Sequence, residues 1–394
     1  MKVPFNIPHA TGNELRNIKE AIELRHLSGD GKFSRLCEQW LQTELQSGKA
    51  LLTHSCTGAL EMAALLADIQ AGDEIIMPSF TFVSTANAFV LRGAVPVFVD
   101  IRPDTLNIDE TLIEQAITEK TKSIVPVHYA GVACEMDPIL SIAERHDLCV
   151  IEDAAQGILA SYNNRKLGSI GHLAALSFHE TKNLIAGESG ALLVNKEEWA
   201  DRAEILREKG TNRRQFFRGV VDKYTWVDVG SSFLPSELQA AFLWAQMESA
   251  VEISERRMKI WNMYHERLAP FESQGLFRRP QIPVNCTHNA HLYYILVNEP
   301  QIRAELMAYL RENQVDGIFH YIPLHSSPGG KKYARTAGAL PNTDLLSETL
   351  LRLPLSIDLE EEQIEFVVST IADFYASRKQ QTLLPLGGKT EQKS

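Results

Sequence analysis

Short apolar stretches alternate with longer amphipathic stretches over the first 250 residues of the chain. The short stretches match the length of buried strands, whereas the longer ones repeat apolar residues at helical spacing. We expect strands at 50–53, 73–77, 95–99, 122–127, 148–152, 174–177 and 190–194. Strands that alternate with helices in this way form a mostly parallel sheet with helices on both faces. The pattern therefore predicts a large α/β domain over residues 1–250.

Helical periodicity fills the gaps between these strands and dominates the rest of the chain. We expect helices at 13–27, 33–45, 59–67, 81–92, 109–117, 136–146 and 196–209. A long helical stretch begins at Pro235 and leads into a small α+β domain. The linking part of this helix and the small domain together occupy residues 251–376. In the small domain we expect strands at 291–297 and 317–321 and helices at 301–311, 345–351 and 360–375. Residues 377–394 are polar and lack periodicity, which predicts a disordered tail.

The composition excludes several classes of partner. The 394 residues carry a formal net charge of -11, which argues against nucleic acid or an anionic membrane surface as the main partner. Five cysteines without C-x-x-C spacing indicate neither a disulfide framework nor a zinc site, so we expect no metal. No apolar run approaches the roughly 18 residues of a membrane-spanning helix. A cytoplasmic protein fits these observations best.

Polar motifs follow five of the predicted strands. They lie at 55–58, 78–82, 128–129, 153–156 and 177–182. Because ligands bind at the carboxyl ends of the strands in parallel sheets, we expect these five motifs to converge on one site.

Two of these motifs carry groups that suit pyridoxal phosphate. Lys182 ends a polar turn after a buried strand and could form a Schiff base, although an ordinary surface lysine would give the same pattern. Asp153 follows another apolar strand. Pyridoxal phosphate needs an amine for its aldehyde, a carboxylate for its ring nitrogen and a cradle for its phosphate. Lys182 and Asp153 are candidates for the first two.

The turn at 55–58 is a candidate for the phosphate cradle. It precedes a helix and contains the hydroxyl of Thr57 and the small residue Gly58, which allows a phosphate to approach the backbone. A plain N-capped helix that binds no phosphate is the alternative.

Two further segments are candidates for substrate contacts. The loop at 210–219 carries Arg213, Arg214 and Arg218, which could bind a diphosphate, although a solvated loop is equally compatible with this pattern. The segment at 320–325 contains His320, Tyr321 and His325 after a predicted strand, as expected for the wall of a cleft.

Taken together, the motifs resemble those of the DegT-type sugar aminotransferases. The resemblance extends to about residue 376 and rests on the segments 55–60, 78–82, 127–131, 152–156 and 177–183. It implies pyridoxal phosphate as the cofactor and the aspartate aminotransferase fold (fold type I), an α/β fold whose large domain has a mostly parallel seven-stranded sheet. It also implies a homodimer with the active site near the subunit interface.

The resemblance also implies a role for each candidate residue. Lys182 would bond the cofactor aldehyde and later act as the general base, and Asp153 would pair with the ring nitrogen. Gln156 would lie near the phenolic oxygen, and Phe82 would stack on the ring. The remaining three residues would hold the phosphate: Thr57, Gly58 and Ser177.

The implied reaction moves an amino group from L-glutamate to a dTDP-sugar. The segments 85–93 and 209–213 are similar to the subgroup that makes dTDP-4-amino-4,6-dideoxygalactose for cell-surface polysaccharides such as enterobacterial common antigen and lipopolysaccharide. The substrate would then be the C4 ketone of dTDP-4-dehydro-6-deoxy-D-glucose. A gluco epimer or a 3-amino sugar is an alternative product, and a regulator that binds pyridoxal phosphate without turnover is an alternative function.

Overall fold

The computed structural model describes residues 1–383 of the chain, with side chains described up to residue 378. Its last helix, α14 (Glu361–Leu383), continues past residue 376, where a disordered tail was expected to begin. The remainder of that predicted tail, residues 384–394, lies outside the described residues. None of the helices within residues 1–383 is long and apolar enough to cross a membrane.

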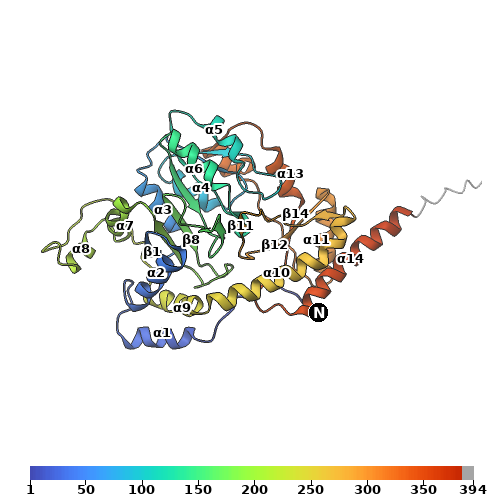
Figure 1. Ribbon diagram of the computed structural model, residues 1–394, viewed down its shortest axis with the longest axis horizontal. Coiled ribbons are helices and arrows are strands. Elements are labelled where there is room, and N and C mark those ends of the chain that lie inside the picture. Colours follow the sequence, from blue (N-terminus) through green and yellow to red (C-terminus); the bar gives the residue numbers. More distant parts are fainter. Residues whose placement is uncertain (384–394) are drawn as a thin grey trace, which may run out of the picture.

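A mixed sheet of eight strands forms the centre of the large domain, with the order β1-β9-β8-β5-β4-β2-β3-β13 (Figure 1). Its strands are β1 (Lys49–Thr53), β2 (Glu74–Pro78), β3 (Val95–Val99), β4 (Thr121–Ile124), β5 (Cys149–Asp153), β8 (Leu173–Ser177), β9 (Gly190–Val194) and β13 (Arg335–Thr336). Strand β9 is antiparallel to both of its neighbours, β1 and β8, and all other neighbouring pairs in this sheet are parallel. The mostly parallel α/β architecture is therefore confirmed.

The sheet has one strand more than the seven expected. The additional strand, β13, comes from the C-terminal part of the chain and pairs with the edge strand β3 through only two residues. A strand of this length leaves no recognisable alternation of apolar and polar residues, so its pairing depends on the tertiary structure.

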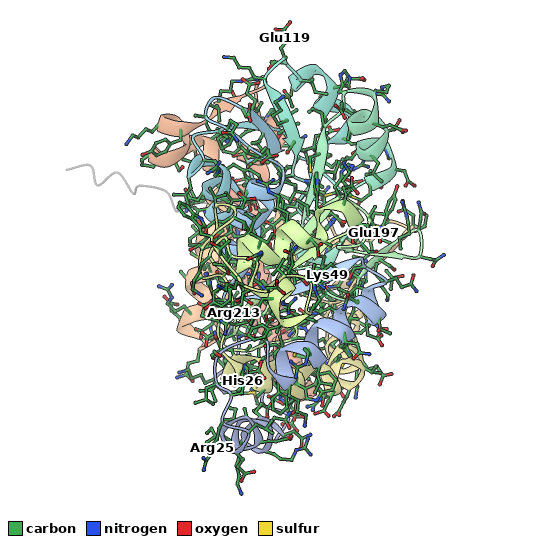
Figure 2. The ribbon with its side chains drawn as sticks, turned by 90° about the vertical axis from the view of Figure 1, so that its left-hand side faces the viewer. Arg25, His26, Lys49, Glu119, Glu197 and Arg213 are labelled. Carbon is green, nitrogen blue, oxygen red and sulfur yellow. The ribbon has the colours of Figure 1, made fainter. Side chains whose placement is uncertain are left out.

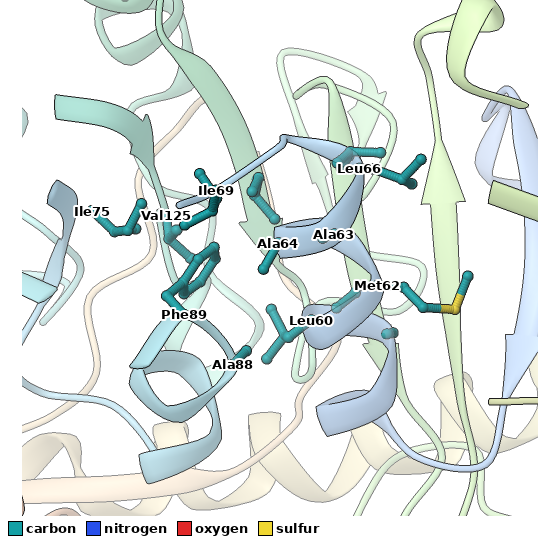
Figure 3. Packing of buried hydrophobic residues seen from close by; sticks show 14 of the residues in the cluster. Leu60, Met62, Ala63, Ala64, Leu66, Ile69, Ile75, Ala88, Phe89 and Val125 are labelled. Atoms are coloured by element: carbon teal, nitrogen blue, oxygen red, sulfur yellow. The ribbon is translucent and has the colours of Figure 1, made fainter. Parts of the chain in front are cut away.

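Helices cover both faces of the sheet. On one face lie α3 (Cys56–Leu66), α4 (Val83–Val90) and α7 (Ala200–Arg207), and Figure 3 shows Leu60 and Ala64 of α3 beside Phe89 of α4. On the other face lie α2 (Lys32–Leu45), α6 (Met136–Arg145) and α9 (Glu237–Glu248), while α1 (Glu14–Glu23) packs on α9.

The alternation along β8 shows how the apolar stretches are used. Leu173 and Ala175 belong to the core on the α3 face, whereas Ala174 and Leu176 belong to the core on the α2 face. Because both faces of this strand are buried, it reads as a continuous apolar run. Polar side chains involved in chemistry are then confined to the strand ends.

The small domain is organised around a three-stranded antiparallel sheet in the order β10-β12-β14, formed by Phe277–Arg278, Tyr293–Val297 and Leu350–Leu353. Helix α10 (Ala250–Ser273) leads into it from the large domain, and α11 (Pro300–Glu312) and α14 cover it (Figure 1). The other α-helices and strands are α5 (Ile113–Ala116), α8 (Arg213–Phe217), α12 (Pro328–Tyr333), α13 (Pro341–Thr349), β6 (Ser161–Tyr162), β7 (Arg165–Lys166) and β11 (Cys286–Thr287).

Two elements predicted for the small domain are wrong. The predicted helix at 345–351 is divided between the end of α13 and the start of β14, because Leu351 and Leu353 of that strand enter the small-domain core. The predicted strand at 317–321 is reduced to an isolated bridge between Ile318 and Arg352. The segment that follows Ile318 instead reaches the end of β2, where the N–H of Leu324 donates to the carbonyl of Ser79 at 3.0 Å.

Candidate active site

The carboxyl ends of β1, β5 and β8 meet at one edge of the sheet. The half-buried Lys182 lies in a turn after β8, where its backbone N–H donates to the carbonyl of His179 at 2.9 Å. Its amine interacts electrostatically with Cys56, which follows β1, and with Asp153, which ends β5. The structure therefore brings together three motifs that are up to 126 residues apart, counted from Cys56 to Lys182.

Burial lowers the pKa of the Lys182 amine below its ordinary value of 10.5, although Cys56 and Asp153 oppose this effect. Burial acts in this direction because a low-dielectric environment disfavours the ammonium form. The neutral amine, which is the nucleophile, is thus available at lower pH than in a solvent-exposed lysine. This property separates Lys182 from an ordinary surface lysine.

Asp153 is held in a defined orientation by two donors. Thr85 of α4 donates its hydroxyl to Oδ2 at 2.7 Å, and the N–H of Ala155 donates to Oδ1 at 3.1 Å. Because the only hydroxyl proton of Thr85 points to Asp153, Thr81 must donate to Thr85 in the 2.8 Å contact between the two threonines. Thr85 could not be predicted from the sequence, because nothing in its local pattern shows that α4 reaches the end of β5.

The neighbouring carboxylate, Glu152, points to the opposite face of the sheet. It is fully buried and accepts a hydrogen bond from Nε2 of His128 at 2.9 Å. Backbone N–H groups of Gly168, Ile170 and Gly171 also donate to it, at 2.6–2.8 Å. Of the acidic pair that ends β5, only Asp153 is therefore directed to the site.

Gln156 connects two walls of the site. Its Oε1 accepts from the N–H of Ala130 at 2.7 Å, and its Nε2 donates to the hydroxyl of Tyr321 at 3.1 Å. His320 lies beside Tyr321, and its Nδ1 is 3.0 Å from the hydroxyl of Tyr129. Burial lowers the pKa of His320 well below its ordinary value, so this imidazole is neutral at physiological pH.

The turn between β1 and α3 combines a capped helix with an open cradle. Ser55 caps α3 by accepting from the N–H of Gly58 at 3.0 Å, which is the alternative considered for this motif. The N–H groups of Cys56 and Thr57 have no carbonyl partner within the helix, as at the start of any α-helix. The Thr57 hydroxyl lies 2.8 Å from that of Ser84. Capping therefore leaves hydroxyls and N–H groups at the turn for an anion.

A glycine allows β9 to pack against this turn. A Cβ added to Gly190 would lie 2.4 Å from the backbone nitrogen of Cys56. Gly190 pairs with Ser177 at the end of β8, which places the Ser177 side chain next to the cradle. Ser177 is buried, and its hydroxyl is 3.5 Å from the N–H of His179.

Phe82 presents an unusually accessible aromatic ring. The side chain is 57% exposed, and its ring centroid lies 6.4 Å from that of Tyr321 at an angle of 45°. Flat apolar surface of this kind suits stacking against another ring. With an amine, a carboxylate and an anion cradle nearby, the residues present fit pyridoxal phosphate.

The three arginines of the 210–219 segment lie against acidic residues. Arg214 pairs with Asp30 and Glu204, and Arg218 pairs with Glu204 at 2.8 Å. Arg213 is half-exposed and lies 3.8 Å from Glu208; Figure 2 shows it on the face that α8 occupies. Arg214 and Arg218 thus have acidic partners of their own, and a diphosphate contact would compete with these pairs.

His325 connects the end of β2 with α13. Its Nδ1 is 2.8 Å from the Ser79 hydroxyl after β2, and its Nε2 is 3.1 Å from Asp344 of α13. It therefore positions the segment that carries His320 and Tyr321.

Arg352 of β14 is a further residue that the sequence pattern does not predict. Its charge acts on Lys182, His320 and Tyr321, although it lies 170 residues after Lys182 in the chain. No local signal distinguishes it, because the sequence pattern predicts a helix over 345–351 that ends immediately before it.

Comparison with known proteins assigns this arrangement to one group. Residues 8–372 match the DegT/DnrJ/EryC1/StrS aminotransferase family. The chain is 33% identical to the spore coat polysaccharide biosynthesis protein SpsC of Bacillus subtilis, over 94% of this chain and 96% of SpsC.

Solved structures give the same result. The aminotransferase TlmJ from Streptoalloteichus hindustanus superposes with a TM-score of 0.87 at 25% identity, covering 96% of this chain and 100% of TlmJ. A DegT DnrJ EryC1 StrS aminotransferase from Brucella abortus superposes with a TM-score of 0.84 at 29% identity, covering 92% of this chain and 95% of that protein.

Proposed function

Because the chain belongs to the DegT/DnrJ/EryC1/StrS aminotransferase family, and is a pyridoxal-phosphate-dependent sugar aminotransferase, we propose a specific reaction for it. The enzyme transfers the amino group of L-glutamate to the C4 ketone of dTDP-4-dehydro-6-deoxy-D-glucose. Glutamate leaves as 2-oxoglutarate, and the product is dTDP-4-amino-4,6-dideoxy-D-galactose for cell-surface polysaccharide. The observation that carries the proposal is that Asp153 ends β5 while Lys182 lies in the turn that follows the neighbouring strand β8, where Asp153 acts on its amine.

Each site residue has a task in this reaction. When bound, pyridoxal phosphate supplies an electron sink that makes a proton next to the amine acidic. Lys182 would hold the cofactor aldehyde and, once displaced by the amino donor, move the proton between substrate carbon and cofactor carbon. Asp153, oriented by Thr85, would keep the ring nitrogen protonated.

The remaining contacts would hold the cofactor in place. Phe82 would cover one face of the ring, and Gln156 would lie near the phenolic oxygen from its position between Ala130 and Tyr321. Thr57, Gly58 and Ser177 would hold the phosphate at the start of α3.

The proposed enzyme is a homodimer with its active site near the subunit interface. Support comes from apolar side chains that are exposed in the segment that contains α8 and the loop after it. They are Phe216, Phe217, Val220, Tyr224 and Trp226, and Trp226 is 78% exposed. Exposed apolar surface of this kind marks an interaction site. Light scattering of the purified protein should give twice the mass of the 44.1 kDa chain.

The first experiment tests the cofactor chemistry. Wild-type protein purified with pyridoxal phosphate should be yellow, and the visible band should disappear in Lys182→Ala. As a matched control, Lys196→Ala removes a lysine that pairs with Glu198 at the surface and should leave the band unchanged. A colourless wild type that does not respond to added cofactor would contradict the assignment of Lys182.

The second experiment tests the substrate. The enzyme is incubated with L-glutamate and the 4-keto sugar nucleotide, and the product is identified by NMR. An axial amine at C4 supports the proposal. An equatorial amine or an amine at C3 would instead identify the gluco epimer or a 3-amino sugar as the product, and would refute the proposed one.

A further inference from the structure

The turn that carries Lys182 has few backbone hydrogen bonds. Among the described residues, the backbone groups of residues 181–185 make only one hydrogen bond to another backbone group, which the N–H of Lys182 donates to the carbonyl of His179. Strands β8 and β9 on either side of this turn are paired along their whole length. Side chains must therefore fix the position of Lys182, and the side chain that follows it, Asn183, is buried.

Asn183 is bound to the segment 289–291, which leads into β12. Its Nδ2 donates to the carbonyl of Asn289 at 2.7 Å, and its Oδ1 lies 2.8 Å from Nδ1 of His291. A carbonyl can only accept, so the amide nitrogen faces Asn289 and Oδ1 accepts from the N–H of His291. Burial, together with the charges of Lys182 and Arg257, holds the pKa of His291 well below its ordinary value. The imidazole is therefore neutral, and its single proton lies on Nδ1.

Asn289 connects the 289–291 segment to the turn that carries Gln156. Its Nδ2 donates to the carbonyls of Gln156 and Ile158, at 2.8 Å each. Gly131 leaves room for this side chain, since a Cβ added there would lie 1.8 Å from Oδ1 of Asn289. The turns that follow β5 and β8 are thus both bound to the same three residues.

A residue in the left-handed conformation lies at the centre of the 289–291 segment. Ala290 has a φ of +52°, which residues with a Cβ rarely adopt. The buried Arg257 of α10 donates to the carbonyls of Ala290 at 3.2 Å and His291 at 2.7 Å, which holds the segment in this form. Backbone strain of this kind persists only where its surroundings fix it, and it is frequent at functional sites.

We infer that His291 is a positioning residue for Lys182, an inference that rests on the role proposed for that lysine. Lys182 has to reach the cofactor aldehyde and, later, the carbon atoms between which it moves a proton. A displacement of about 1 Å is enough to slow such a step about 100-fold. His291 prevents this displacement through Asn183, whose backbone continues directly from that of Lys182.

The cofactor-free enzyme provides a test that needs no turnover. Fluorodinitrobenzene, which reacts with neutral amines, is applied over a range of pH, and labelling of Lys182 is quantified by mass spectrometry. The hydrogen bond of His291 keeps the lysine turn in its buried position, and burial lowers the pKa of the amine. The midpoint of labelling in His291→Phe should therefore move upward, toward the ordinary pKa of 10.5.

The reaction with L-glutamate tests the proton transfer itself. Conversion of the yellow enzyme is followed by absorbance, with hydrogen or deuterium at C2 of the donor. His291→Phe should slow conversion at saturating glutamate about 10- to 100-fold, with KM changed by less than about twofold. The deuterium isotope effect should equal or exceed that of wild type, because the slowed step is the proton transfer. A purely structural loss would lower the amount of active enzyme and leave the labelling midpoint unchanged.

Further variants separate the hydrogen bond from the ring. His291→Asn keeps an N–H at the position of Nδ1 and should restore most of the rate and of the labelling midpoint. Asn183→Ala removes the other partner, and combining it with His291→Phe should cost little more than either change alone. The matched control is His265→Phe, which replaces a half-buried imidazole that stacks on Trp261 at 4.5 Å, and it should leave both measurements unchanged.

Several outcomes would overturn the inference. One is an unchanged midpoint and an unchanged glutamate reaction in His291→Phe, or in Asn183→Ala if the first variant does not fold. Another is an equal loss in His291→Asn and His291→Phe, which would assign the effect to the ring, and a lost isotope effect would assign it to a different step. A wild type that does not react with glutamate would refute the proposed donor only, and the labelling midpoints would still decide the role of His291. A visible band that survives Lys182→Ala would refute the role of Lys182 and, with it, that of His291.

Discussion

Replacing Glu152 by glutamine should destabilise the large domain without changing any residue that faces the site. Two oxygens of Glu152 accept four hydrogen bonds: Oε2 accepts from His128 and Gly168, and Oε1 accepts from Ile170 and Gly171. Glutamine keeps one oxygen and substitutes an NH₂ group for the other. Two of the four buried donor groups then face this NH₂ group, which is itself a donor and cannot accept their hydrogen bonds.

The size of the effect follows from those two donors. A buried donor left without an acceptor costs about 1–3 kcal/mol, so Glu152→Gln should cost about 2–6 kcal/mol. Glu197→Gln is the matched control, because it makes the same chemical change at an exposed glutamate and should stay within about 0.5 kcal/mol of wild type.

The loss should depend on pH. Burial alone would raise the pKa of Glu152, but hydrogen bonds from His128, Gly171 and Gly168 outweigh it and hold the pKa below the ordinary value of 4.5. A carboxyl group whose pKa is lowered on folding stabilises the fold above its unfolded pKa, and this stabilisation fades as the pH falls. The difference between wild type and Glu152→Gln should therefore be full at neutral pH and shrink below pH 4.5.

Urea denaturation followed by tryptophan fluorescence measures the effect. The visible band of the cofactor is recorded in parallel, and midpoints are compared because a chain with two domains need not unfold in one step. Coincident midpoints for Glu152→Gln, Glu197→Gln and wild type would refute the reasoning, as would a difference that grows at low pH.

Three further predictions concern the site. Thr85→Val removes the 2.7 Å hydrogen bond to Asp153 and should weaken pyridoxal phosphate binding about 10- to 100-fold, measured by titration of the cofactor-free protein; unchanged affinity would show that Asp153 needs no support from α4. Gly190→Ala places a Cβ against the nitrogen of Cys56 and should release the cofactor more readily on dialysis, whereas retention equal to wild type would mean that the cradle adjusts. Because the pKa of Lys182 is lowered from 10.5, the rate of cofactor uptake should rise with pH and level off below pH 10.5. A rate that still rises at pH 10.5 would show that the Lys182 amine is not neutral at lower pH.

Local patterns in the sequence predicted the strands of the large domain well. Runs such as Leu173–Ser177 are buried on both faces, so their apolar composition is visible without any knowledge of their neighbours. The prediction was wrong where contacts made elsewhere decide the structure, as at β14. That strand forms because Leu351 and Leu353 enter the small-domain core, not because of a local preference.

The sequence by itself determined the α/β class and the chemistry available after each strand, because these depend on residue type and spacing, and its motifs resemble those of the sugar aminotransferase family that the comparison then showed. Only the tertiary structure decided which side chains meet. It directed Asp153 to the site and Glu152 into the opposite core, since successive residues of a strand face opposite ways. It supplied Thr85 from a separate helix and Arg352 from the other domain. It also placed Arg214 among acidic residues, where its charge is already partnered. Such pairings join residues far apart in the chain, and no local pattern records them.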